Sequence, residues 1–142
     1  ASEDVGNADP RAIGIAGAAA RAVEFVGMPE ARIPLAQAAI FVALAPKSNA
    51  AYRAIDAALE HVERHGAQRP PMALRDSSRL NAKNFGNGQG YRYPHDFPDA
   101  VLDESLLPDG MEHVSFYTPS IRGAEAQLDA RLRELRAARR TP

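Results

Sequence analysis

The chain has 142 residues, a formal net charge of −1, 45% hydrophobic residues and no cysteine. These values are typical of one globular domain and exclude a disordered or fibrous chain, disulfides, thiolate metal sites and cysteine nucleophiles. The near-neutral charge excludes a globally basic nucleic-acid-binding protein. No apolar run reaches the ~20 residues of a membrane span, and the acidic N-terminus is unlike a signal peptide. We therefore expect a soluble cytoplasmic protein with no membrane partner.

A first helix is predicted over residues 10–26. Asp9 and Pro10 fit an N-cap and first-turn pair, because the carboxylate accepts from free amides and proline loses no needed donor there. Gly27 ends the helix and Pro29 prevents its continuation. Apolar residues recur at helical spacing and predict its buried stripe, namely Ile13, Ala16, Ala20, Val23 and Val26.

A second helix is predicted over residues 32–45, with Pro34 in its first turn and Pro46 after its end. Gln37 is the only polar side chain between those prolines. A helix that is apolar on every side must be surrounded, so it is either a central core helix or a surface that a second subunit covers. The candidate core or interface residues are Ile33, Leu35, Ala36, Ala39, Ile40, Val42 and Ala43.

A third helix is predicted to begin after a cap at Ser48 or Asn49 and to end near His65, before Gly66. Its stripe is expected to cover a core on one side and consists of Tyr52, Ile55, Leu59 and Val62. His61 lies four residues before His65, but two ligands near a helix end do not close a zinc site. We interpret both as surface histidines.

Residues 67–118 form a loop-rich segment, because prolines and glycines interrupt every long pattern. A short helix over 71–84 and a turn over 99–106 are predicted within it. Aromatic side chains are expected to pin this segment to the rest of the domain, namely Phe85, Tyr91, Tyr93, Phe97, Phe116 and Tyr117.

A final helix is predicted to start at Thr118, with Pro119 in its first position. Its apolar stripe consists of Ile121, Ala124, Leu128, Leu132 and Leu135. No alternation persists long enough to build a sheet, so the predicted fold class is all-α.

Charge is uneven along the loop-rich part. Residues 64–95 hold six Lys or Arg and one Asp, a net of +5, whereas residues 96–113 hold six Asp or Glu and no cation, a net of −6. Pairing between these neighbouring segments is the favoured interpretation. The alternative is a patch for nucleic acid or a protein partner, with the candidates Arg75, Arg79, Lys83, Tyr91 and Arg92.

No motif predicts an enzyme. The glycine-rich run 86–90 lacks the lysine and the preceding strand of a P-loop, and indicates a structural turn. His95 and Asp96 are adjacent, with no nucleophile implied nearby. We expect no catalytic, cofactor or metal site in this chain.

Several strings, in order, resemble the C-terminal part of the RarA/MgsA family of replication-associated AAA+ ATPases, which is related to the Werner helicase-interacting protein. They lie at residues 1–6, 8–10, 27–38, 45–49, 51–55 and 90–98. Residues 99–105 depart from the family's usual Gly-Gly-Trp sequence, so no partner contact is inferred for residues 99–107, and Asn7 replaces a usual leucine.

The resemblance implies that residues 1–142 are a single helical oligomerisation domain similar to the clamp-loader collar. It implies a homotetramer whose AAA+ core, with ATP and Mg, lies outside this fragment. The full-length proteins are DNA-dependent ATPases that maintain stalled forks on the nucleoid with single-stranded-DNA-binding protein. The fragment is expected to assemble subunits without ATPase activity, or alternatively to dock DNA or that protein through residues 64–95.

Overall fold

The computed structural model describes residues 1–138, apart from the side chains of Lys83 and Ala138. Its α-helices are α1 (Arg11–Val26), α2 (Arg32–Leu44), α3 (Ala50–His65) and α4 (Glu125–Ala138). The short 3-10 turns are η1 (Gly6–Ala8), η2 (Met72–Leu74), η3 (Ala82–Phe85), η4 (Pro94–Asp96) and η5 (Pro98–Ala100). Residues 1–138 contain no strand, and the predicted all-α fold class is confirmed.

The chain divides into two compact units. The first comprises Ala1–Leu59 and Phe116–Leu132, and the second comprises Glu60–Ser115 together with the segment that begins at Arg133. The single-domain organisation expected from the length stays a prediction.

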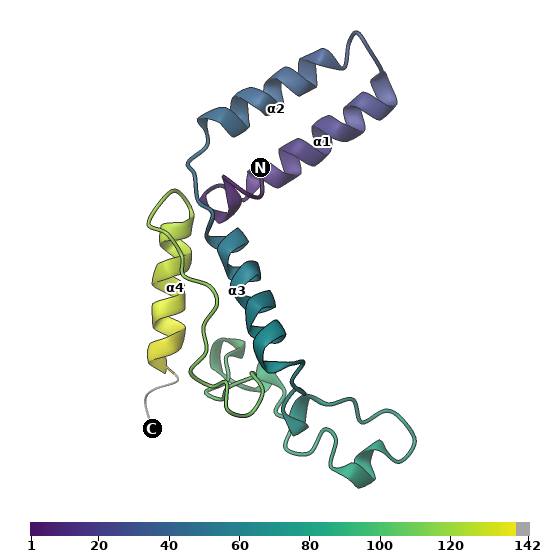
Figure 1. The fold of residues 1–142 in the computed structure, drawn as a ribbon, viewed down its shortest axis with the longest axis vertical. Helices are drawn as coiled ribbons and strands as arrows, with labels where there is room; N and C mark the ends of the chain where they lie inside the picture. Colours follow the sequence, from purple (N-terminus) through teal and green to yellow (C-terminus); the bar gives the residue numbers. More distant parts are fainter. Residues whose placement is uncertain (139–142) are drawn as a thin grey trace. The chain divides into compact units, whose positions relative to one another are not determined.

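In the first unit, α1 and α2 form an antiparallel hairpin (Figure 1). Asp9 caps α1 by accepting from the Arg11 amide at 3.2 Å, and it also pairs with the Arg11 guanidinium at 2.7 Å. This guanidinium lowers the pKa of the Asp9 carboxyl. At the other end, the Gly27 amide donates to the Val23 carbonyl, and the backbone φ of Gly27 is 74°. The predicted first helix is thus confirmed with its start and stop signals.

The buried face of the hairpin differs from the predicted one. Ala12 and Ala19 are buried on α1 and Ala38 is buried on α2, whereas Ile13 and Val26 of the predicted stripe are exposed. Periodicity identified a helix but did not show which face the chain itself covers. The two helices pack through small side chains and leave the larger ones outside.

The start of α3 matches its prediction. The Ser48 hydroxyl accepts from the Ala50 amide at 3.2 Å, and the Ser48 amide donates to the Asp4 carbonyl at 2.7 Å. The helix ends at His65, as expected from Gly66. Ser48 therefore both caps α3 and ties its start to the N-terminal segment.

Two predicted helices are wrong in extent. No helix spans residues 71–84. Pro70 and Pro71 are followed only by the short turn η2, and Asn81, whose φ is 67°, separates η2 from η3. The final helix begins at Glu125 and not at Thr118. Residues 118–124 instead form a loop whose Ala124 amide donates to the Ala8 carbonyl at 2.8 Å.

The aromatic residues of the loop-rich segment behave unequally. Phe85, Tyr91 and Tyr93 are exposed, so their predicted pinning role is wrong. The half-buried group contains Phe97, Phe116 and Tyr117.

Candidate functional site

The outward face of α2 is apolar and exposed. No residue from Ile33 to Leu44 carries a charge, and Ile33 and Ile40 are 65% and 60% exposed. Ala36 and Ala43 are exposed on the same side of the helix. In the described chain α2 is not enclosed, so it is not the central core helix that was one of the two expectations.

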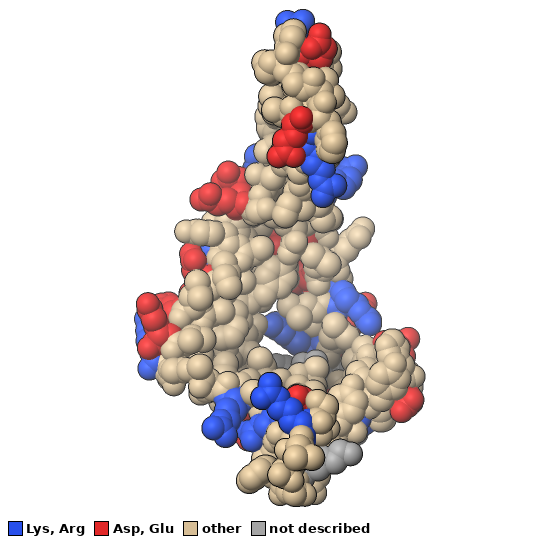
Figure 2. Space-filling view, turned by 90° about the vertical axis from the view of Figure 1, so that its right-hand side faces the viewer, with Lys and Arg blue, Asp and Glu red and all other residues tan. Residues whose placement is uncertain are grey.

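The predicted interface candidates on α2 are arranged in two groups. Six are exposed, namely Ile33, Leu35, Ala36, Ala39, Ile40 and Ala43, whereas Val42 is half-buried. Figure 2 shows one face of the molecule, and much of the α1–α2 hairpin at its top is formed by uncharged residues. Six of the seven candidates are thus available to a partner.

The stripe of α3 is also uncovered. Its residues are between 46% and 59% exposed, and they are Tyr52, Ile55, Leu59 and Val62. The expectation that this stripe covers a core is wrong for the described chain. The half-buried positions of α3 within the first unit are instead the small residues Ala51, Ala54 and Ala58.

The core of the first unit shows an inverted burial, in which small side chains are buried and larger apolar ones are exposed. Its buried apolar residues are Val5 and alanines, whereas many bulky apolar side chains of its helices, such as Ile33, Ile40 and Leu59, are exposed. Alanine has little apolar surface to bury, so exposed isoleucine and leucine side chains leave apolar surface in contact with water. Contiguous apolar surface of this kind is typical of interaction sites.

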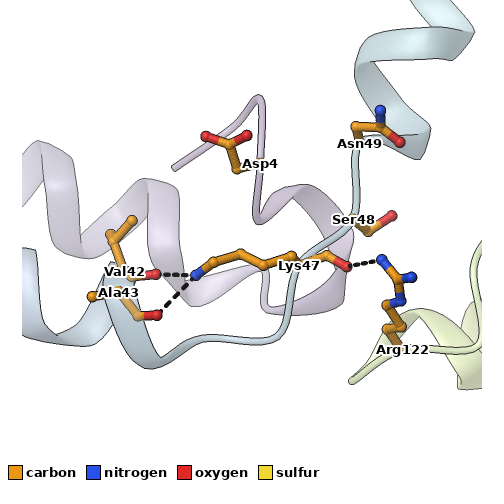
Figure 3. A pocket seen from close by; sticks show the side chains of 7 residues that line it. All are labelled: Asp4, Val42, Ala43, Lys47, Ser48, Asn49 and Arg122. Carbon is orange, nitrogen blue, oxygen red and sulfur yellow. Dashed lines mark hydrogen bonds between the residues drawn. The ribbon is translucent and has the colours of Figure 1, made fainter.

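A pocket lies where the N-terminal segment, the end of α2 and the loop before α3 meet (Figure 3). The Lys47 ammonium donates to the carbonyls of Val42 and Ala43 in the last turn of α2 and to that of Ala45, just after the helix. Arg122 donates to the Lys47 carbonyl at 3.2 Å. Both cations that line the pocket therefore make contacts within the chain, and we interpret the pocket as structural.

A buried carboxylate organises the loop before α4. Glu125 is 0% exposed and accepts from the Tyr117 hydroxyl at 2.6 Å and the Ser120 hydroxyl at 2.5 Å. Burial raises the pKa of this carboxyl, but hydrogen bonds outweigh it, so the pKa lies below its ordinary value; the donors are Ser120, Ser48 and Tyr117. Sequence reasoning missed this network, because no motif pairs Glu125 with Tyr117 and Ser120, and Ser48 lies far from them in the chain.

The basic segment is partly neutralised. Arg92 pairs with Asp103 at 2.8 Å and with Glu104 at 3.9 Å, and its guanidinium lies 4.3 Å from the centre of the Phe97 ring. Pairing between the basic and acidic segments, the favoured interpretation, thus occurs at Arg92. The Arg92 guanidinium thus makes its contacts within its own chain, and its role as a partner candidate stays a prediction.

Two of the remaining nucleic-acid candidates make contacts with residues close to them in the chain. Arg75 donates to the Pro70 carbonyl at 2.9 Å, and Arg79 lies 3.9 Å from Asp76. Tyr91 is exposed, and the side chain of Lys83 lies outside the described part of the structure. Among the described residues, Arg75 and Arg79 thus make separate local contacts.

The glycine-rich run is a structural turn in the described chain. The Gly88 amide donates to the Met72 carbonyl at 2.9 Å, and the Gln89 amide donates to the Gly86 carbonyl at 3.0 Å. These amides are used internally, which is unlike a phosphate-binding loop.

Three of the histidines lie beside another ring. The rings of His61 and His65 stack at 4.3 Å, and those of Tyr93 and His95 lie 5.1 Å apart. Among the described residues, no group of three or more His, Asp or Glu side chains is arranged to hold a metal ion.

No described helix is both long and apolar enough to cross a bilayer.

Comparison with known proteins gives a consistent picture. Residues 1–136 match the family model described as MgsA AAA+ ATPase C terminal. The replication-associated recombination protein A of Escherichia coli K12 is 41% identical over 133 residues, covering 93% of this chain and 30% of that protein. The Haemophilus influenzae protein of the same name is 40% identical over 137 residues, covering 96% and 31%.

A eukaryotic protein is also similar. ATPase WRNIP1 of Dictyostelium discoideum is 34% identical over 135 residues, covering 91% of this chain and 15% of that protein. The chain thus spans about 30% of the length of the bacterial relatives described above.

Proposed function

This chain belongs to the MgsA AAA+ ATPase C-terminal family, and we propose that it holds copies of its parent protein together. The observation that carries the proposal is the inverted burial of the first unit. Alanines fill its core, while Ile33, Ile40 and Leu59 are each about 60% exposed. A second copy of the chain supplies the cover that the chain itself does not provide.

The proposed parent protein is an ATPase that acts in replication-associated recombination, since that is the name of its bacterial relatives. ATP and Mg bind in its AAA+ portion, and the present chain contributes assembly and no hydrolysis. We propose four copies per assembly, in line with the resemblance described above.

Self-association has a direct physical basis here. Burying apolar surface contributes roughly 25 cal/mol per Å², and a stable interface removes roughly 800 Å² per partner from water. Residues 33–44 of α2 carry no charge, so covering them with a partner incurs no cost of removing a charge from water.

Sedimentation equilibrium of the 142-residue chain tests the proposal. We expect oligomers at micromolar concentration, and we expect Ile40→Glu to weaken them because a carboxylate then enters an apolar contact. A chain that stays monomeric at several hundred micromolar contradicts the proposed function.

A further inference from the structure

Two exposed apolar stripes on this chain share one spacing. On α2 the stripe is Ile33, Ala36, Ile40 and Ala43, and on α3 it is Tyr52, Ile55, Leu59 and Val62. Each follows intervals of three, four and three residues. Such intervals place side chains in the seam between two packed helices.

We infer that α2 of one copy packs against α3 of a second copy, so that the chain assembles head to tail. This inference rests on the proposed self-association and names the surfaces that carry it. Each copy then offers one α2 surface and one α3 surface, and both stripes are covered by a single type of contact.

The lengths of the stripes agree. Each extends over eleven residues, or about 15 Å of helix at 1.5 Å per residue. The whole of α2 has 13 residues and is therefore long enough to cover the stripe of α3.

The side-chain sizes are also complementary. The α2 stripe alternates isoleucine with alanine, whereas every residue of the α3 stripe is bulky. Small residues on one helix let large residues of the other approach its backbone, and alternating sizes fill the space between helices. Ala36 and Ala43 leave room for side chains such as Leu59.

Charge disfavours a symmetric contact in which α3 of one copy packs against α3 of a second copy. Asp56 and Glu63 each follow a stripe residue, Ile55 and Val62, along one edge. An antiparallel pair of α3 helices brings these acidic edges of both copies together, and facing like charges destabilise a helix pair. Residues 33–44 carry no ionisable side chain, so α2 can lie on the α3 stripe without such repulsion.

An antiparallel pair of α2 helices is the competing arrangement. It buries α2 on both copies but leaves both α3 stripes exposed. The head-to-tail contact covers both, and it continues from copy to copy until a ring closes.

Mixing two variants distinguishes these arrangements. Ile40→Glu disables α2 and Leu59→Glu disables α3, and both positions are exposed in the single chain, so each variant should fold. Each alone should associate at least about 30-fold more weakly than the wild type, as expected for loss of a central apolar contact. Ala57→Glu is the matched control, because it adds the same charge at an exposed position outside the stripe of α3.

In the head-to-tail arrangement, an equimolar mixture of the two variants retains one intact contact, between α2 of the Leu59→Glu copy and α3 of the Ile40→Glu copy. We expect this mixture to form one-to-one heterodimers, measured by sedimentation velocity with one variant fluorescently labelled. Ala57→Glu should assemble like the wild type.

If the wild type assembles but the mixture stays monomeric, the head-to-tail contact is wrong and self-association proceeds through another surface. The same conclusion follows if Leu59→Glu assembles like the wild type. If the wild type itself is monomeric, the proposed function fails as well, so the two failures are distinguishable.

Discussion

The Tyr117 hydroxyl donates to the buried Glu125 carboxylate at 2.6 Å while it accepts from the Asn7 side-chain amide at 3.2 Å. This pair connects the N-terminal segment to the start of α4. A buried carboxylate is stable only where hydrogen bonds replace its lost hydration, and here Ser120 supplies a second donor. The network therefore fixes the loop that precedes α4.

Removing the charge of Glu125 should destabilise the fold. Glu125→Gln replaces an oxygen acceptor with an amide donor facing the hydroxyls of Tyr117 and Ser120, which leaves buried polar groups poorly paired. We expect a loss of about 1–3 kcal/mol in the free energy of unfolding, measured by urea denaturation at pH 7. Glu134→Gln, an exposed change on the same helix, is the control. Equal stability of both variants would contradict the structural role of Glu125.

The same carboxylate predicts a pH dependence. The pKa of Glu125 is lowered in the folded state, so the folded state binds its proton more weakly than the unfolded chain, whose pKa is ~4.3. The contribution of Glu125 is thus fully present above that unfolded pKa and is lost as the pH falls through the folded pKa. Urea denaturation at pH 7 and at pH 3 measures it: the stability difference between wild type and Glu125→Gln should shrink at the lower pH. A difference that grows on acidification would show that the folded pKa is raised.

The sequence predicted helices better than it predicted burial. Proline, glycine and capping residues act within a few positions, so α1 could be bounded from Asp9 and Gly27, and α3 from Ser48 and Gly66. The start of α4 could not, because it depends on contacts such as the hydrogen bond from the Ala124 amide to the Ala8 carbonyl. Such long-range contacts leave no local pattern.

The prediction of which residues are buried failed for a different reason. Periodicity marks the apolar face of a helix but not whether that face meets the same chain or another one. The stripe around Leu59 is correct as an apolar face, and it is exposed because the chain buries Ala50 instead. The α2 candidates could be identified from the sequence because no charged residue interrupts them. The partner of Arg92, Asp103, could be identified only from the structure.

The Arg92–Asp103 pair should be visible by titration. Hydrogen bonding from Arg92 holds the pKa of the Asp103 carboxyl below its usual value. We expect Arg92→Ala to raise the pKa of Asp103 toward ~3.9, as followed by carboxyl carbon chemical shifts in NMR. Asp76 is the internal reference, because its lowered pKa arises mainly from Ser78 and should not move. An unchanged Asp103 titration would show that Arg92 is free for other partners.

A pair of glycine substitutions tests the loop before α4 against an open helix position. Gly123 has a φ of 54°, and a Cβ added there would overlap the Ala8 carbonyl oxygen, the same oxygen that accepts from the Ala124 amide. Backbone atoms cannot rotate away as a flexible side chain does, so Gly123→Ala should cost more than about 2 kcal/mol of unfolding free energy. Gly17 lies within α1 with open space around its Cβ position. Gly17→Ala should therefore stabilise by about 0.5–1 kcal/mol, because alanine restricts the unfolded chain and favours helix.

Thermal and urea denaturation of both variants measure these opposite effects. Since each change adds one methyl group, the difference between them reports only backbone conformation and available space. A Gly123→Ala variant as stable as Gly17→Ala would mean that the loop does not pack on the Ala8 carbonyl. It would also remove the contact that sets the start of α4, since the Ala124 amide would then lack its partner.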